Sequence, residues 1–157
     1  MPKGQCRWLW LSLILLLADL AVKKLAVMYL AYGVSTNIFP CFNLTLVYNS
    51  GSAFGFMQNF GGLQRWILSG IAILISLLLI VWLKRLPKKE NITACALSLI
   101  IAGAWGNMLD RLIFGYVTDF IDLYYKTWHW PAFNLADTFI CVGVIVLMFA
   151  KVGNGRG

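Results

Sequence analysis

Residues 66–83 read WILSGIAILISLLLIVWL, a run that contains no charged side chain. A helix needs about 20 predominantly apolar residues to cross a hydrocarbon core about 30 Å thick. The run comes close to that length and is bounded by basic residues on its C-terminal side, beginning with Lys84. It therefore predicts a membrane-spanning helix, and this prediction decides the class of the fold.

The composition of the whole chain agrees with a membrane protein. Of its 157 residues, 61% are hydrophobic and only 12% are charged, whereas a soluble domain carries roughly 25% charged residues. The net charge of +7 would favour a nucleic-acid partner in a soluble protein. In a membrane protein the basic residues instead report orientation, so no nucleic acid is expected to bind.

Three further apolar runs predict three more spans. The first is interrupted by Asp19, Lys23 and Lys24. We therefore expect an all-α membrane protein with four transmembrane helices, forming one integral membrane domain over residues 1–157. The added spans run from near Trp8 to near Ala31, from Ile92 to about Asp110, and from about Asn134 to Ala150.

The basic residues predict the orientation of these spans. Eight of the 13 lie before the first span, between the second and third, or after the fourth. Because short cytoplasmic segments are enriched in Lys and Arg, both termini are expected to be cytoplasmic. The eight residues are Lys3, Arg7, Lys84, Arg85, Lys88, Lys89, Lys151 and Arg156.

Two longer segments should then lie outside the cytoplasm. In the first, Tyr32 to Arg65, residues 42–49 read FNLTLVYN, and this alternation predicts a short strand between helices 1 and 2. It would place Asn43, Thr45, Val47 and Asn49 together on one face. The second segment, Arg111 to Phe133, is expected to be a loop whose tyrosines and tryptophans form an interfacial aromatic belt.

Four of the six acidic residues map to the outer end of the predicted bundle: Asp110, Asp119, Asp122 and Asp137. Asp19 lies deeper in the first span, where Lys23 at i+4 is on the same helix face, so a neutralised pair is expected. Membrane-embedded ionisable groups normally face the bundle interior and have a partner.

The third predicted span places Gly103, Asn107 and Asp110 on one stripe. Together with Gly106, the glycine would allow close approach of another helix, across which Asn107 could hydrogen-bond. Arg111 could pair with Asp110 or anchor the helix at the interface. A structural hydrogen-bonding cluster is the favoured interpretation of this stripe.

The fourth span begins with Asn134 and Asp137, which are spaced like a helix cap with an acid in the first turn. Asp119, 18 residues before Asp137 and on the same predicted side, supports a second interpretation. Two carboxylates from different segments suggest an aspartic dyad, in which one carboxyl keeps its proton because two close charges repel.

Other chemistries lack their sequence patterns. There is no HExxH, no GxSxG and no phosphate loop, and the four cysteines show no metal-ligand spacing, so neither a metal nor a cofactor is expected. His129, the only histidine, lies in an aromatic loop and is interpreted as an interfacial residue.

Five separated blocks resemble the lipoprotein signal peptidase (signal peptidase II) family of bacterial aspartic membrane peptidases. They occur in order over nearly the whole chain: DLAVK at 19–23, NSGSAF at 49–54, GAWGNMLDR at 103–111, VTDF at 117–120 and FNLAD at 133–137.

The resemblance implies an endopeptidase of the bacterial cytoplasmic (inner) membrane with an active site near the outer leaflet. Its substrate would be a diacylglyceryl-modified prolipoprotein, cut on the amino side of the lipidated cysteine. We expect a monomer in contact with membrane lipids. The resemblance assigns catalysis to Asp119 and Asp137. It assigns substrate-binding or supporting roles to Asp19, Lys23, Asn49, Gly51, Gly103, Asn107, Asp110, Arg111, Asn134 and Ala136, and leaves Asp122 as a solvated loop acid.

Two other functions fit part of the pattern. A proton- or cation-conducting protein also uses intramembrane acids, but its polar groups would be spread through the membrane, whereas these crowd one end. A purely structural membrane subunit would not explain Asp119 and Asp137 together.

Overall fold

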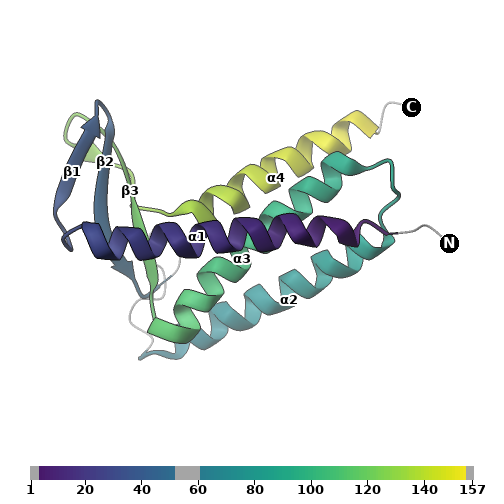
Figure 1. Ribbon diagram of the computed structural model, residues 1–157, viewed down its shortest axis with the longest axis horizontal. Helices are drawn as coiled ribbons and strands as arrows, with labels where there is room; N and C mark the ends of the chain where they lie inside the picture. Colours follow the sequence, from purple (N-terminus) through teal and green to yellow (C-terminus); the bar gives the residue numbers. More distant parts are fainter. Residues whose placement is uncertain (1–3, 52–60, 155–157) are drawn as a thin grey trace.

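The computed structural model describes residues 4–51 and 61–154, which form four long helices and a four-stranded sheet (Figure 1). A short 3₁₀ turn, Cys6–Trp8, precedes the first helix. The elements are α1 (Leu9–Tyr29), β1 (Ser35–Phe39), β2 (Phe42–Asn49), α2 (Leu63–Arg85), α3 (Asn91–Phe114), β3 (Val117–Tyr125), β4 (Trp128–His129) and α4 (Leu135–Asn154).

Each predicted span corresponds to one helix. Among the described residues, α2 and α3 are the helices that are both long and apolar enough to cross a membrane by length and composition. In α4 the apolar part, Leu135–Ala150, is shorter. In α1 three charged residues interrupt the apolar sequence. The number of four spans therefore stays a prediction.

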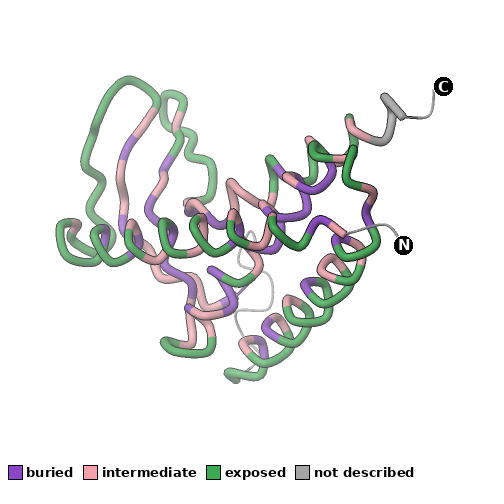
Figure 2. The backbone as a smooth tube through the Cα atoms, turned by 45° about the vertical axis from the view of Figure 1, so that its right-hand side comes forward, coloured by how far each residue is buried: buried purple, intermediate pink, exposed green. Residues whose placement is uncertain are grey.

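The helix α3 lies at the centre of the bundle and packs against α1, α2 and α4. Much of α3 is buried, whereas most of α2 is exposed or only partly buried (Figure 2). Glycines allow the close approach of α4, as predicted for Gly103: a Cβ atom there would collide with the carbonyl oxygen of Ala136. Farther along the contact between α3 and α4, a Cβ atom on Gly143 of α4 would collide with the Ile100 side chain and the Ala96 carbonyl oxygen of α3.

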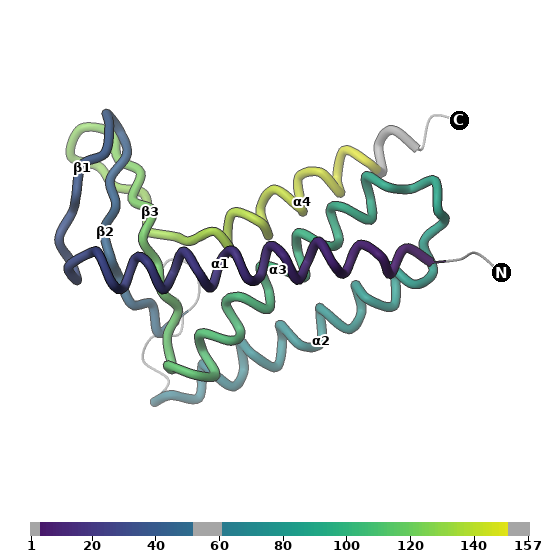
Figure 3. The backbone as a smooth tube through the Cα atoms, in the orientation of Figure 1, coloured from purple at the N-terminus to yellow at the C-terminus, as the bar shows by residue number. Residues whose placement is uncertain are grey.

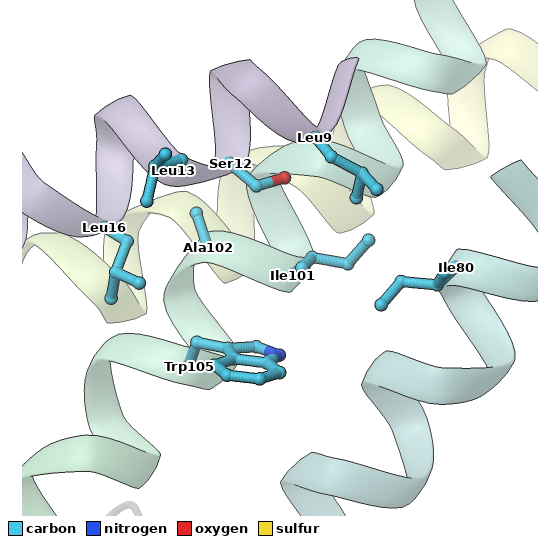
Figure 4. Close-up of a pocket in the computed structure, with 8 residues that line it drawn as sticks. All are labelled: Leu9, Ser12, Leu13, Leu16, Ile80, Ile101, Ala102 and Trp105. Carbon is cyan, nitrogen blue, oxygen red and sulfur yellow. The ribbon is translucent and has the colours of Figure 1, made fainter. Parts of the chain in front are cut away.

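A crevice of about 220 Å³ lies between α1, α2 and α3 (Figure 4). Its lining is almost wholly apolar, and the Ser12 hydroxyl at its wall donates to the Ser98 carbonyl oxygen at 2.9 Å. Among the described residues no titratable side chain lines it, so the acidic residues singled out by the sequence lie elsewhere. The lining residues are Leu9, Ser12, Leu13, Leu16, Ile80, Ile101, Ala102 and Trp105.

The antiparallel sheet lies at one end of the bundle, opposite the end where α1 begins and α4 ends (Figure 3). Its strands follow the order β1-β2-β3-β4, so both loop segments contribute to it. The strand predicted at residues 42–49 is confirmed as β2. The prediction of a loop from Arg111 to Phe133 is wrong, because β-branched and aromatic residues in Val117–Tyr125 form a strand once β2 lies beside them.

A β-bulge interrupts β2 between Leu44 and Val47. On β2, Asn43 and Val47 are four positions apart, while their partners on β3, Asp122 and Asp119, are three apart. One extra residue therefore lies on β2, and side chains beyond it change face. The predicted common face for Asn43 and Asn49 is consequently wrong.

Candidate active site

The predicted catalytic residues come from two elements that meet beside the sheet. Asp119 lies on β3, and Asp137 lies in the first turn of α4. Asp119 is buried, with 2% of its surface exposed. The two aspartates are joined through side chains on α3 and at the start of α4, as the contacts of Asn134 and Asn107 show.

Asn134 touches both aspartates and is itself fully buried. Its Nδ2 donates to Asp119 Oδ1 at 2.7 Å, and its backbone N–H donates to Asp137 Oδ2 at 3.3 Å. Its Oδ1 accepts from the backbone N–H of Asp137 at 3.0 Å, which is the exchange of bonds seen in a capping box. The cap interpretation is therefore confirmed, and the same cap links the two carboxylates of the predicted dyad.

Asn107 on α3 continues this network across the helix interface, as predicted. Its Nδ2 donates to Asp137 Oδ1 at 2.7 Å. Its Oδ1 accepts from Asn134 Nδ2 at 3.1 Å and from Lys23 Nζ at 3.2 Å. Each amide therefore has a fixed orientation, since reversing Asn107 would place two donors face to face.

The environment of Asp119 favours its protonated form. Burial raises the pKa of Asp119 to about 7, and the nearby charge of Asp137 acts in the same direction. Hydrogen bonds from Asn49 Nδ2, at 3.2 Å, and from Asn134 oppose the rise because they favour the ionised form. A carboxyl group with this pKa can hold or release a proton near neutral pH.

Lys23 joins two buried carboxylates behind the pair. Its Nζ lies 2.9 Å from Asp19 Oδ2, which confirms the predicted pair, and 3.1 Å from Asp110 Oδ2. All three side chains are almost completely buried. Asp19 Oδ1 accepts from the N–H of Ala136, and Asp110 Oδ2 accepts from the N–H of Thr118, both at 3.0 Å. The cluster thus fixes the starts of α4 and β3.

Arg111 connects α3 to the end of β2. Its guanidinium donates to the carbonyl oxygens of Asn107 at 3.3 Å and Gly51 at 3.2 Å. Within residues 4–51 and 61–154, no ion pair joins it to Asp110. The N–H of Gly51 donates to Asn49 Oδ1 at 3.0 Å, so the Asn49 side chain is held on both sides. Residues 52–54 of the block NSGSAF lie outside the described residues.

The prediction that Asp122 is a solvated loop acid is wrong. Only 5% of its surface is exposed, because it lies in a strand between neighbours rather than in a loop. It accepts hydrogen bonds from Asn43, Thr45 and His129 at 3.2, 2.9 and 2.8 Å. Burial alone would raise the pKa of Asp122, but these three bonds outweigh it and hold the pKa below its usual range.

His129 is half-exposed, yet its Nδ1 faces Asp122. The contacts of Asp122 with Asn43, Thr45 and His129 were not predicted from the sequence, because they form only when distant segments pair. Across the described ranges, no three His, Cys, Asp or Glu side chains lie together as a metal-binding group.

Comparisons with known proteins point to one family. Residues 11–152 match the family described as signal peptidase (SPase) II. The chain is 52% identical over 142 residues to the lipoprotein signal peptidase of Pseudoalteromonas translucida, covering 90% of this chain and 86% of that protein. It is 44% identical over 144 residues to that of Vibrio vulnificus, with the same coverage.

Two solved structures have the same fold. Both are bacterial membrane enzymes determined by the in meso method, at 2.3 and 1.9 Å resolution. The first matches with a TM-score of 0.86 and 27% identity over 99% of this chain and 94% of that one. The second matches with a TM-score of 0.81 and 27% identity over 96% and 97%.

Proposed function

The chain belongs to the signal peptidase II family, and from that premise we propose that Asp119 and Asp137 are its catalytic pair. It is an aspartic peptidase that cleaves signal peptides from prolipoproteins. The observation that carries the assignment of the pair is Asn134, a buried amide that bonds to both carboxylates. The cut falls on the amino side of the diacylglyceryl-modified cysteine.

The pair divides the acid and base roles. Asp119 starts protonated, consistent with its pKa of about 7, and Asp137 starts ionised. Asp137 removes a proton from water as the water oxygen attacks the scissile carbonyl carbon, and Asp119 donates its proton to the carbonyl oxygen. In the resulting diol, Asp119 takes back a hydroxyl proton while Asp137 protonates the leaving nitrogen. The C–N bond then breaks and both carboxyl groups return to their starting states.

This division predicts an alkaline loss of activity. As pH rises through about 7, Asp119 loses the proton that the reaction requires, so kcat/KM should decline there. The measurement is a pH profile of kcat/KM for the detergent-solubilised enzyme on a lipid-modified peptide. Binding of the same peptide, measured over the same range, is the control for loss of substrate affinity. A kcat/KM that stays constant between about pH 6 and pH 9 would contradict the assignment of the acid.

The other residues named by the resemblance support the pair rather than react. Asn49, Asn107 and Asn134 orient the carboxylates through hydrogen bonds. Gly51 and Arg111 hold the Asn49 end of β2 close to α3. The supporting residues on the membrane side of the pair are Asp19, Lys23, Gly103, Asp110 and Ala136.

We propose that the chain forms one domain with four spans in the cytoplasmic (inner) membrane. At about 1.5 Å per residue, the 21 residues of α1 and the 20 of α4 each reach about 30 Å, the thickness of the hydrocarbon core. Basic residues gather at the end away from the sheet, which is then cytoplasmic. The pair therefore lies near the outer leaflet, where water meets the lipid-anchored substrate.

Two native cysteines test this topology. Both Cys41, in the turn between β1 and β2, and Cys6, before α1, are exposed. In spheroplasts, a membrane-impermeant maleimide should label a chain that keeps Cys41 alone, and should label a chain that keeps Cys6 alone only after lysis. Labelling of Cys6 in intact spheroplasts would contradict the proposed orientation and place the N-terminus outside the cytoplasm.

Lipid contact and a monomeric state complete the proposal. The exposed faces of α2 and α4 carry large apolar side chains, among them Leu74, Leu78 and Met148. Such faces are suited to contact with the hydrocarbon chains of lipids. The hydrogen bonds described above join the catalytic pair to residues of its own chain, which supports a site built within one copy.

A further inference from the structure

A second group of polar residues, outside the catalytic pair, lies on the sheet. Asp122 is three positions after Asp119 on β3, and successive side chains of a strand alternate between faces. The two aspartates therefore lie on opposite faces of the same strand. Asp122 with its three donors is called the Asp122 cluster: Asp122, Asn43, Thr45 and His129.

Neighbouring hydrogen bonds determine which atoms of Asn43 and Thr45 donate to Asp122. Asn43 Oδ1 accepts from Asn37 Nδ2 at 3.0 Å, so its Nδ2 is the atom that points to Asp122. The hydroxyl oxygens of Thr45 and Ser35 lie 2.8 Å apart. Because a hydroxyl has one hydrogen, Thr45 donates it to Asp122 and accepts from Ser35. Three donors thus meet a group that only accepts.

The cluster includes residues at the start of the β-bulge, and the catalytic contact lies beyond the bulge. Asn43 is paired with Asp122 before the bulge, and Asn49 is paired with Val117 after it. Removing the extra residue would shift the later part of β2 by one position and turn its side chains to the opposite face. Asn49 would then point away from Asp119, to which it now donates at 3.2 Å.

We propose that the Asp122 cluster fixes the bulge and so holds Asn49 against Asp119. The cluster bonds Asp122 to Asn43, which lies before the bulge, and to Thr45, which lies within it, and so opposes a slip of the strand. Asp122 is therefore a positioning residue for the catalytic acid. This inference rests on the proposed catalytic role of Asp119. It adds that the Asp122 cluster maintains the hydrogen bond from Asn49 to Asp119.

Thr45 gives the sharpest test because two variants separate its hydroxyl from its shape. Thr45→Val keeps the branched side chain but removes the donor, and should lower kcat about fivefold or more with little change in KM. Thr45→Ser keeps the hydroxyl and should restore most of kcat. Asp122→Asn should have a larger effect, because its amide would place a donor against a donor.

The pH profile distinguishes positioning from general loss of structure. Loss of the Asn49 hydrogen bond removes a contact that favours ionised Asp119, so the alkaline limb should move to higher pH. Thr45→Val and Asp122→Asn should move it in the same direction as Asn49→Ala does. In the double variant Asn49→Ala/Asp122→Asn, kcat should be no lower than in the worse single variant. The control is Glu90→Gln, which removes one negative charge, as Asp122→Asn does. Glu90 accepts from Thr93 at the start of α3, so this variant should leave kcat and the alkaline limb of the pH profile unchanged.

Three outcomes would overturn the inference. The first is wild-type kcat and an unshifted limb in Thr45→Val. The second is a lower kcat with an unshifted limb, and the third is effects that multiply in the double variant. If instead Asp119→Asn retains turnover, the proposed function fails whatever the Thr45 variants show.

Discussion

Asp119→Asn and Asp137→Asn should each lower prolipoprotein cleavage by about 10³-fold or more, since a positioned general acid or base contributes about 10²–10⁴-fold and here the two act as one unit. An amide has the shape of the carboxyl group but neither releases a proton at neutral pH nor removes one from water. At position 119, the amide oxygen still accepts from Asn134. The variant therefore keeps the principal contact while losing the chemistry.

The measurement is single-turnover cleavage by purified protein, with unfolding monitored in parallel. The Asp119→Asn variant should be about as stable as the wild type at neutral pH, because removal of a buried group that is charged part of the time offsets the loss of the Asn49 hydrogen bond. At position 137, both oxygens accept from donors, so Asp137→Asn should also lose some stability. Near-normal turnover in either folded variant would show that the pair is assigned wrongly.

Lys23→Met should have the largest effect on stability. It leaves Asp19 and Asp110 buried and facing the space vacated by their shared cation. Removing one partner of a buried ion pair costs about 3–5 kcal/mol, a large part of the 5–15 kcal/mol that stabilises a typical protein. The free energy of unfolding in detergent should fall accordingly, and activity should fall with it, because Lys23 also bonds to Asn107.

The neighbouring lysine provides a matched control. Lys24 is exposed, and Lys24→Met removes the same charge from the same turn of α1. Its unfolding free energy should stay within about 0.5 kcal/mol of the wild type, as is usual for surface changes. Adding Asp110→Asn to Lys23→Met should recover part of the lost stability, since one buried charge is then removed. Equal stability of the Lys23→Met and Lys24→Met variants would contradict a buried role for Lys23.

The sequence was sufficient for the features that depend on neighbours along the chain. Hydrophobic runs predicted the helices to within a few residues, and the spacing of Asp19 and Lys23 predicted their contact. The polar start of α4 likewise identified Asn134 as a cap, which the structure confirms. In each case the interacting groups lie within one or two helical turns.

The sheet was only partly predictable because its contacts join distant segments. Asn43 and Asp122 are 79 positions apart, and nothing in either segment alone indicates that they pair. The bulge had a further consequence: strict alternation assigned Asn43 and Asn49 to one face, and a single extra residue separates them. The resemblance gives Asp122 no role and leaves it as a solvated loop acid, and this expectation fails because Asp122 lies in a strand that the sequence did not predict.

The bond between Asp19 and the N–H of Ala136 spans 117 positions of the chain. At a synthesis rate of about 5–20 residues per second, α1 leaves the ribosome roughly 6–23 s before the backbone that its carboxylate binds. In the proposed four-span topology, Lys23, one helical turn away, can neutralise the carboxylate during that interval and make its entry into the bilayer less costly. The same lysine therefore has two roles. It pairs with Asp19 during synthesis, and it contacts Asp110 and Asn107 once the helices have packed together.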